Sequence, residues 1–464
     1  MIEINNQHYI IFSEVNMKQA IFNVSHDYSC DVLVAGGGVG GLAAAVSAAR
    51  LGERVILIES GGFLGGTATK GLVGPFMTCY DAKGETVIIR GFFAEFVDRM
   101  VADGGAVSYR DCPGGDSHSG YRLKGHIGVT PFDVESFKRV SEEMCLEAGV
   151  KLLYHVSLIG CETNGDKITH VYIATNGGID RISANVFIDA TGSATLAALA
   201  GAETFRGDET GFLQTASTFF RIEGVDREML DRHMDETSEM RSRYYMDEIE
   251  RGRLRGEFPC GTQKLRIFEA PNGLWTVNMS QEDSELNEFD PEAVTAAEIS
   301  QRKQIKEIVE FLKKTVPALK NIRLIDSAAE IGIRESRRIV GHHMFCLDDI
   351  QKHRYFEDRI AVCANSIDIH KSNLVDYTAH DGSNYYVPLS CLLSKNITNL
   401  LAAGKCVSTD KYAHAAIRVI PPCMAVGEAA GVCAALASRA GVKHFEVPAS
   451  EVQRIIKENG GYIG

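Results

Sequence analysis

The hydrophobic pattern near the start of the chain predicts two strands joined by a helix. A β-branched apolar run at 31–35 ends at glycines, which is typical of a buried parallel strand. Residues 41–51 are rich in alanine with helical spacing, and Gly52 follows at the position where such a helix ends. A second apolar run covers 54–59. The pattern therefore predicts a βαβ unit with parallel strands.

Apolar positions further along predict one more helix and a small sheet. Helical spacing resumes at 136–148, after a glycine-rich stretch at 61–130 whose lack of periodicity indicates loops. Strand-like segments then follow at 151–156, 168–175 and 181–189. Asn-Gly pairs separate these segments and favour hairpin turns, so we expect a three-stranded meander.

The composition changes again in the middle of the chain. Residues from about 206 to about 380 are more charged, with a predicted long helix at 298–315 that Pro317 stops. Strand, glycine and small-residue helix then return over 399–440, as if the chain rejoins the first sheet.

We therefore expect an α/β fold in which a Rossmann-like domain is interrupted by an inserted α+β substrate domain. The predicted divisions are an N-terminal extension at 1–28, the two parts of the first domain at 29–205 and 380–464, and the insert at 206–379.

Charge and cysteine content narrow the class of protein. The chain has 48 basic and 61 acidic side chains, a formal net charge of −13, and no basic run, which argues against nucleic acid and anionic membranes as partners. No uninterrupted apolar stretch is close to about 20 residues long, the length that a membrane-spanning helix needs. The first residues of the sequence lack the pattern of a secretory signal. Twelve cysteines never form a CxxC pair, so no metal or iron–sulfur site is predicted and a reducing cytoplasm is the expected location.

The turn after the first predicted strand has the glycine spacing of a dinucleotide site. Gly36 suits the tight turn, Gly38 allows backbone N–H groups to approach a pyrophosphate, and Gly41 allows the helix to pack against the strand. Glu59 ends the second strand, 23 positions after Gly36, where an acid accepts hydrogen bonds from a ribose. Strand, turn, helix and acid together predict a bound dinucleotide.

The sequence after Glu59 favours FAD over NAD. A second glycine-rich turn follows at once, including Gly65, Gly66 and Thr67, in place of the next strand–helix unit of a nicotinamide domain. No second strand-flanked GxGxxG occurs, so one site for one dinucleotide is expected. This arrangement favours a flavin that its substrate reduces directly.

Longer motifs give the chain a family resemblance. It resembles the FAD-dependent oxidoreductase family that groups with the flavin-containing part of heterodisulfide reductase, within the glutathione-reductase-like flavoprotein fold. The resemblance rests on GGFLGGTATKGLVG at 61–74, FIDATGSATLAALAG at 187–201, QTASTFFRIEGVD at 214–226, IGIRESRRIVG at 331–341, SIDIH at 366–370, NLLAAGKCVS from 399 and AIRVIPPCMAVGEAAG ending at 431.

The resemblance implies further cofactor contacts. It places Val156 at the adenine through its backbone, and Gly404 beside the pyrophosphate and ribityl chain. It also assigns two short segments, a turn on the adenine and pyrophosphate side and a helix start aimed at the flavin pyrimidine ring: Ala190, Thr191 and Gly192, and Pro422, Cys423, Met424 and Ala425. A helix N-terminus stabilises an anion, which suits the charge of a reduced flavin. The family's iron–sulfur clusters are not expected, because this chain lacks the cysteine runs.

Several polar residues are candidates for catalysis. His414 and Arg418 precede the helix start that the resemblance places at the flavin. Arg334 is the arginine of its motif best suited to clamp a substrate carboxylate, whereas Arg337 and Arg338 suit a solvated or internally paired stretch.

A second group of candidates remains more open. Asp368 and His370 alternate along a predicted strand, so they share a face and form either a base with its orienting acid or a structural pair. His118 and His126 are weaker candidates in the glycine-rich stretch. A redox disulfide of Cys79 and Cys423 is disfavoured, because neither has a CxxC neighbour.

These features predict hydride transfer between a small polar organic substrate and the flavin N5, with a separate electron acceptor. The alternatives are an electron-transfer subunit of a larger redox complex and a flavin-dependent RNA-modifying protein, and the acidic charge argues against the second. The sequence leaves the substrate, the acceptor and the oligomeric state open, including a homo-oligomer.

Overall fold

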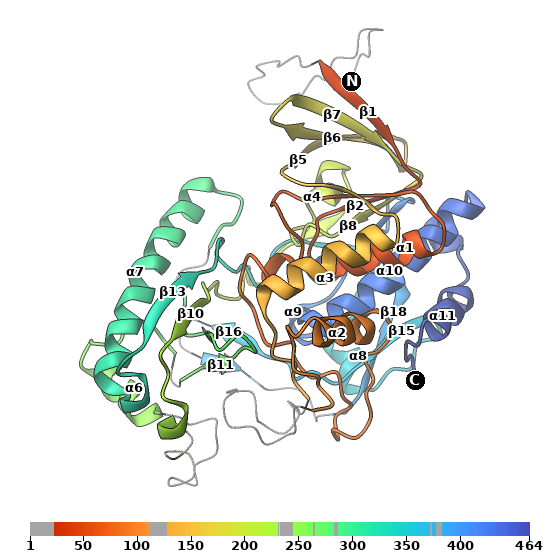
Figure 1. The fold of residues 1–464 in the computed structure, drawn as a ribbon. Coiled ribbons are helices and arrows are strands. Elements are labelled where there is room, and N and C mark those ends of the chain that lie inside the picture. Colours follow the sequence, from red (N-terminus) through yellow and green to blue (C-terminus); the bar gives the residue numbers. More distant parts are fainter. Residues whose placement is uncertain are drawn as a thin grey trace.

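The computed structural model describes residues 23–111, 128–230, 232, 245–262, 265–282, 286–371, 374–376 and 383–464. Most of the predicted N-terminal extension, together with His118 and His126, lies outside these residues. Two large hydrophobic cores form within the described part of the chain, besides a third cluster of only three buried residues, Ala216, Ala297 and Ile331. Figure 1 shows the smaller of the two large cores as a lobe of sheet and long helix beside the larger, layered body.

A five-stranded parallel sheet forms the centre of the larger body. Its strands lie in the order β19-β8-β2-β3-β4, and every neighbouring pair is parallel. Their bounds are Leu400–Ala402, Val186–Asp189, Val32–Ala35, Val55–Ile58 and Lys151–Leu153 in that order. The predicted βαβ unit is confirmed as β2, helix α1 (Val39–Arg50) and β3. The late strand β19 rejoins the early ones, as the pattern near residue 400 predicts.

Two small-residue helices pack closely beside this sheet. Helix α10 (Ile420–Ala440) lies against α1 (Figure 1), and Gly427 and Gly431 form its contact surface. A methyl group added at Gly427 would lie 2.2 Å from Gly40 O, and one at Gly431 would lie 2.2 Å from Ala44 O. By length and composition α10 is long and apolar enough to cross a membrane, but 89% of its most apolar window is buried. That burial is the environment of a core helix.

The predicted meander is present with different strands. It consists of β5 (Ser157–Asn164), β6 (Lys167–Thr175) and β7 (Gly178–Ser183), joined by the two Asn-Gly turns. The predicted strands at 151–156 and 181–189 are corrected, because β4 and β8 within them belong to the parallel sheet. The sheet gains a fourth strand, β1 (Val24–Ser29), parallel to β7, so the stretch before residue 29 contributes to this domain.

The smaller core contains an antiparallel sheet in the order β11-β12-β10-β13. The bounds of these strands are Ile267–Glu269, Trp275–Val277, Phe220–Glu223 and Arg323–Ser327. Helix α6 (Met246–Leu254) and helix α7 (Pro291–Thr315) accompany the sheet, and α7 begins seven residues before the predicted start because Asp290 caps it. This lobe lies within the span 206–379 that the sequence analysis predicts as an α+β insert.

The insert is smaller than the predicted span 206–379. Buried residues from Ile339 to Ile369 belong to the larger core, and the smaller core runs only from Phe220 to Ile322. The charged composition of the middle of the chain did not reveal this return, because the returning strands are short. Three two-stranded sheets lie in this region: β9 (Thr204–Phe205) with β14 (Arg338–Ile339), β15 (Arg359–Cys363) with β18 (Tyr385–Pro388), and β16 (Ile369–Lys371) with β17 (Leu374–Asp376).

The remaining α-helices of the described residues surround the parallel sheet and its connections. They are α2 (Phe92–Ala102), α3 (Val134–Glu147), α4 (Thr195–Leu199), α8 (Leu347–Gln351), α9 (Lys411–Ile417) and α11 (Ala449–Glu458). The predicted helix at 136–148 is confirmed as α3. Its N-cap Asp133 accepts a hydrogen bond from Ser136 N.

Candidate cofactor and substrate sites

The glycine turn between β2 and α1 has the packing that its spacing predicts. Gly36 has a φ of +103°, and an added Cβ there would lie 2.5 Å from Ala190 O. An added Cβ at Gly41 would lie 1.9 Å from Gly36 O, so this glycine allows the helix to approach the strand. At Gly38 an added Cβ would meet only Ala190 O, at 3.9 Å, which leaves an open face at the start of α1. This open face is where a pyrophosphate would approach backbone N–H groups.

Glu59 is held as an anion at the end of β3. Its Oε2 accepts from Gly37 N at 2.8 Å, its Oε1 accepts from Gly61 N at 2.7 Å, and Lys70 Nζ lies 2.7 Å from Oε1. Burial raises the pKa of Glu59, but Lys70 and the two N–H groups outweigh it and keep that pKa below its ordinary value. Glu59 is thus an ionised acceptor at the predicted ribose position.

A cleft, here called the cofactor cleft, runs from Glu59 past the glycine turn to the start of α10. Eleven of the predicted cofactor residues line it: Gly36, Gly38, Glu59, Gly66, Thr67, Val156, Ala190, Thr191, Gly192, Gly404 and Cys423. The other five pack around its lining: Gly41, Gly65, Pro422, Met424 and Ala425. Glycines where a phosphate approaches, an ionised acid at the ribose position and a helix N-terminus at the far end together fit an FAD molecule.

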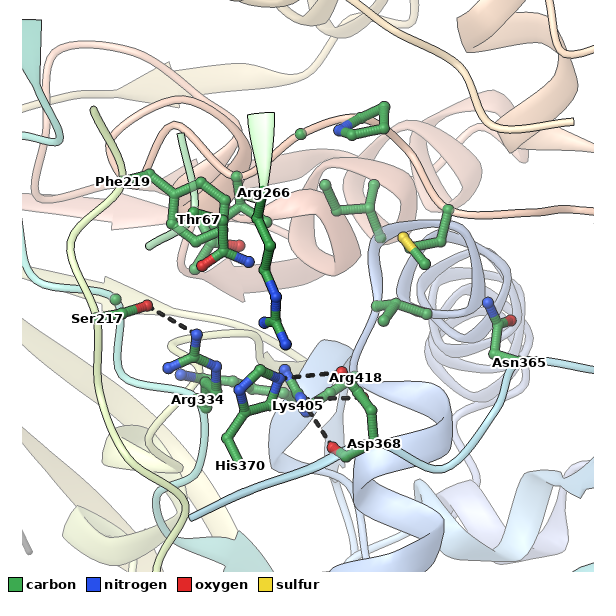
Figure 2. A pocket seen from close by; sticks show the side chains of 18 of the residues that line it. Thr67, Ser217, Phe219, Arg266, Arg334, Asn365, Asp368, His370, Lys405 and Arg418 are labelled. Carbon is green, nitrogen blue, oxygen red and sulfur yellow. Dashed lines mark hydrogen bonds and ion pairs between the residues drawn. The ribbon is translucent and has the colours of Figure 1, made fainter. Parts of the chain in front are cut away.

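A second cavity adjoins the cofactor cleft and is called the substrate cavity below. The two share Thr67, Gly332, Ile333, Lys405, Arg418 and Ile420 in their walls. Figure 2 shows polar side chains pointing into the substrate cavity from both lobes. Its lining adds apolar side chains such as Val73, Met77 and Phe219, and polar ones such as Asn278 and Asn365. Because the two spaces share a wall, a molecule in this cavity would meet one in the cleft.

Asp368, His370 and Arg418 form a connected group in the substrate cavity. Asp368 Oδ2 lies 3.1 Å from His370 Nε2, and Asp368 Oδ1 accepts from Arg418 Nη2 at 3.1 Å. Burial and the charge of Arg334 lower the pKa of His370, although Asp368 opposes this shift. Burial would raise the pKa of Asp368, but Arg418 and His370 lower it below its ordinary value. The group therefore contains a neutral imidazole and an ionised carboxylate at neutral pH.

Arg334 also lies in the substrate cavity, but the protein already uses its fork. Its Nη1 donates to Thr215 O, and its Nη2 donates to Ser217 Oγ at 2.7 Å. The predicted carboxylate clamp is thus engaged by the backbone and side chain of the segment before β10. Arg334 still contributes its charge to the cavity.

His414 is placed differently from the other predicted catalytic residues. It lies in α9 at 1% exposure and belongs to the lining of neither cavity. Burial, with Arg338 and Arg418 nearby, lowers its pKa well below the ordinary value. His414 lies one helical turn before Arg418. The sequence alone therefore could not show which of these two side chains faces the cavity.

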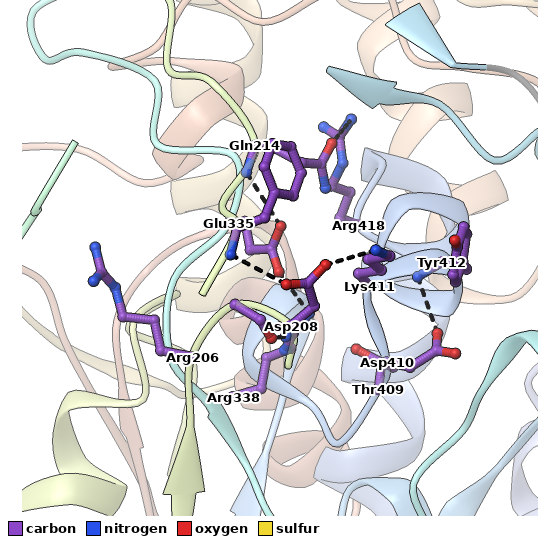
Figure 3. A network of polar contacts seen from close by, with 12 residues as sticks. Arg206, Asp208, Gln214, Glu335, Arg338, Thr409, Asp410, Lys411, Tyr412 and Arg418 are labelled. Atoms are coloured by element: carbon purple, nitrogen blue, oxygen red, sulfur yellow. Dashed lines mark hydrogen bonds and ion pairs between the residues drawn. The ribbon is translucent and has the colours of Figure 1, made fainter. Parts of the chain in front are cut away.

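A polar network that includes Gln214 and Glu335 lies beside Arg418 (Figure 3). It also holds His370 in place. Gln214 Oε1 accepts from His370 N at 3.3 Å and from Arg418 Nη2 at 3.4 Å. Gln214 N in turn donates to Glu335, whose carboxylate pairs with the fully buried Arg338 at 2.9 Å. The expectation that Arg338 is internally paired is confirmed, and the segment 335–338 supports the site from behind.

The two cysteines considered for redox chemistry lie in different surroundings. Cys423 lines the cofactor cleft, whereas Cys79 is buried and lines neither cavity. Burial raises the pKa of both thiols to about 12, so neither is a thiolate at neutral pH. All cysteines in the described part of the chain are unbridged.

Sequence reasoning missed four residues of these sites. Lys405 follows the predicted Gly404 and lines both cavities, and Lys70 pairs with Glu59. Gln214 begins a motif that the resemblance includes, and Arg266 comes from the edge of the inserted sheet. The first three lie next to predicted residues or within a quoted motif, so the sequence contained a signal that could have identified them. Arg266 has no such signal.

Lys405 is a half-buried cation at the shared wall of the two cavities. Its Nζ donates to Ile333 O, and no carboxylate of the described residues forms an ion pair with it. Burial lowers its pKa to about 8, so it stays mostly protonated at pH 7. A partly buried charge of this kind is stabilised when an anion occupies either neighbouring space.

The fold and the sites define a class of nucleotide-binding α/β oxidoreductase with adjoining cofactor and substrate spaces. A family model described as FAD dependent oxidoreductase matches residues 31–456. The chain belongs to this family. It is an FAD-dependent oxidoreductase, with FAD as its cofactor.

None of the curated proteins matches the chain significantly. Among solved structures, a geranylgeranyl bacteriochlorophyll reductase-like protein from Thermoplasma acidophilum is 13% identical, with a TM-score of 0.46, over 93% of this chain and 84% of that one. The flavin-dependent brominase Bmp2 is 14% identical, with a TM-score of 0.47, over 93% and 84%. The p-nitrophenol 4-monooxygenase PnpA from Pseudomonas putida is 13% identical, with a TM-score of 0.42, over 93% and 81%. At these values their reactions have no bearing on this chain.

Proposed function

We propose that this FAD-dependent oxidoreductase transfers a hydride between a small polar organic substrate and the flavin N5, in a glutathione-reductase-like arrangement. The observation that carries the proposal is the group Asp368, His370 and Arg418 in a cavity that shares its wall with the cofactor cleft. When bound, FAD accepts or returns the hydride. A reaction of this kind also needs a base, an orienting group and a space for the substrate.

The residues of the substrate cavity divide these tasks. His370 is neutral, and its Nε2 hydrogen bond to Asp368 fixes the ring and leaves Nδ1 as the proton acceptor. Asp368 orients His370 and compensates the charge that His370 gains with the proton. Arg418 holds Asp368 in turn. In the oxidative direction the substrate loses a hydride from carbon and a proton to His370, and a separate electron acceptor later reoxidises the cofactor.

Substitution of His370 by glutamine tests this role. Metabolites that bleach the flavin absorbance of the wild-type holoenzyme under anaerobic conditions are first identified. For such a substrate we expect His370→Gln to slow reduction about 10²–10⁴-fold, the contribution of a general base, while FAD stays bound. His26→Gln, at a side chain that is 67% exposed on β1, is the matched control and should reduce at the wild-type rate. Equal rates in the wild type and His370→Gln would exclude His370 as the base.

The second candidate is an electron-transfer subunit of a larger complex. It predicts a stable partner protein that copurifies with the chain. The substrate cavity, with its own candidate base, favours the enzyme that acts on a small molecule. We also propose a cytoplasmic location for this enzyme.

A further inference from the structure

Arg266 places a guanidinium of the inserted sheet in the substrate cavity. It precedes β11 at the edge of that sheet, and its carbonyl accepts a hydrogen bond from Asn278 N at 3.0 Å. Both residues line the substrate cavity, and Figure 2 shows the half-buried Arg266 side chain pointing toward His370 and Arg418. The insert thereby contributes a cation to a site whose other charged residues come from outside its sheet.

Arg266 differs from the other cations of the cavity in its partners. Arg334 donates to Thr215 and Ser217, Arg418 binds Asp368, and Lys405 donates to a backbone carbonyl. Within the described residues, the Arg266 guanidinium has neither a hydrogen-bond acceptor nor an ion-pair partner. Its planar fork of N–H donors therefore remains available to a ligand.

The lining of the cavity also carries an excess of positive charge. Four cationic side chains, Arg266, Arg334, Lys405 and Arg418, face a single acid, Asp368. That acid is already bound by Arg418 and His370. Partly buried cations without a counter-charge are costly, and an anionic ligand removes that cost. The excess is local, because the whole chain has a net charge of −13.

We propose that Arg266 binds a carboxylate group of the substrate, so that the enzyme acts on a small organic acid. A guanidinium fork matches the two coplanar oxygens of a carboxylate, and Arg266 is the cation whose fork is not used by the protein. Val73, Met77 and Phe219 provide an apolar wall for the carbon skeleton. The proposal rests on the proposed function and names its substrate class. In this proposal Arg266 determines the substrate specificity, and His370 accepts the proton.

Binding of simple acids to the FAD-loaded protein tests the proposal without turnover. The probes are benzoate and succinate, with benzamide and succinamide as uncharged counterparts and inorganic phosphate as a different anion. Binding is followed by the flavin spectrum and by equilibrium dialysis. We expect at least one of the two acids to bind at least tenfold more tightly than its amide and than phosphate.

Variants of Arg266 then locate the binding. Arg266→Met should raise the dissociation constant of the bound acid at least tenfold, and Arg266→Lys, which keeps the charge without the fork, should give an intermediate value. Arg323→Met is the matched control on β13, the opposite edge of the same sheet. Its side chain is 77% exposed and pairs with Glu223, so acid binding should be unchanged. If Arg266→Met does not fold, Arg266→Lys and the comparison of acid with amide still decide the question.

Three outcomes would overturn the proposal: neither acid binds, the amides bind as tightly as the acids, or Arg266→Met leaves acid binding unchanged. Tighter binding of phosphate than of either acid would also overturn it and indicate a phosphate site. The two proposals fail separately. Arg266-dependent acid binding without any His370-dependent flavin reduction would reject only the hydride-transfer function. Reduction of the flavin by uncharged substrates, and by no acid, would reject only the proposal that the substrate carries a carboxylate.

Discussion

Lys405 is protonated and half-buried where the cofactor cleft meets the substrate cavity, so its charge has opposite effects in the empty and the loaded protein. Replacing it with methionine removes a partly desolvated cation, and the apoprotein should gain on the order of 1–3 kcal/mol at pH 7. The same change removes a cation near bound anions, so FAD should dissociate at least tenfold more readily. Thermal unfolding of apoprotein and fluorimetric titration with FAD measure the two effects.

The control for Lys405→Met is Lys352→Met, because the Lys352 side chain is 66% exposed and pairs with Asp348. Both readouts should match the wild type there. An unchanged FAD affinity in Lys405→Met would contradict a role of this charge in holding the cofactor.

Single residues were predictable where one chemical task determines the residue type. Gly36 and Gly41 have no room for a side chain, and Glu59 follows at the expected spacing, so local sequence was sufficient. Asp368 and His370 were found because alternation along a strand places both on one face. Arg266 was missed because its role depends on where the edge of the inserted sheet meets the larger body. No local sequence pattern indicates this contact.

At the scale of elements, the contact between α1 and α10 supports the glycine turn. Alanine at Gly427 would bring a methyl group to 2.2 Å from Gly40 O, and Gly40 itself lines the cofactor cleft. We expect overpacking to cost about 1–3 kcal/mol, against a gain of about 1 kcal/mol in helix propensity, and FAD retention to fall as Gly40 shifts. Chemical denaturation and the flavin content after gel filtration measure the two effects.

A glycine in an open turn provides the comparison. At Gly177 an added methyl group would meet only Thr175 Oγ1, at 3.7 Å. Gly177→Ala should therefore leave both readouts near the wild-type values. Full flavin content and unchanged stability in Gly427→Ala would mean that the two helices can separate without cost.

Elements were predicted well where the apolar period is long and poorly where strands are short. The βαβ unit, α3 and the late part of α7 follow from their spacing alone. Segment 181–189 was interpreted as one strand, but Ala184 and Asn185 divide it between two sheets. Burial on both faces gives β8 no alternation that would assign it to a sheet, and β4 has only three residues, which is too short to show one.

For the whole molecule, stability should depend on pH through Glu428. This carboxyl is 3% exposed inside α10, accepts from Phe92 N at 3.1 Å, and burial raises its pKa to about 7 from 4.5. Below pH 4.5 the group is protonated in both states. As pH rises toward 7 the unfolded chain loses the proton first, so folding stability falls, by about 3 kcal/mol once the pH exceeds 7.

Glu428→Gln keeps an acceptor for Phe92 N without the ionisation. Its unfolding free energy should therefore exceed that of the wild type at about pH 8 and approach it at about pH 5. Urea denaturation at the two pH values measures this difference. A difference between variant and wild type that is the same at both pH values would show that Glu428 does not titrate in this range.

The predicted division of the whole chain rests on a change of composition. The C-terminal boundary of the insert was placed near 380, whereas buried residues from Ile339 onward already pack in the larger core. Strands of two to five residues carry too little periodicity to reveal such a return. The segments that line the substrate cavity are also far apart in sequence. The sequence therefore could not show which side chains share this cavity.

The position of β19 and α10 in the larger body has a consequence for synthesis. The first glycine turn leaves the ribosome early, but the helix that supports Gly40 and the strand that completes the sheet edge come from residues 400–440. The core of the insert, which ends at Ile322, is complete long before. Domains of a nascent chain fold in the order in which they are completed. We therefore expect the insert to fold first and FAD to be captured only after residues 400–440 have been synthesised.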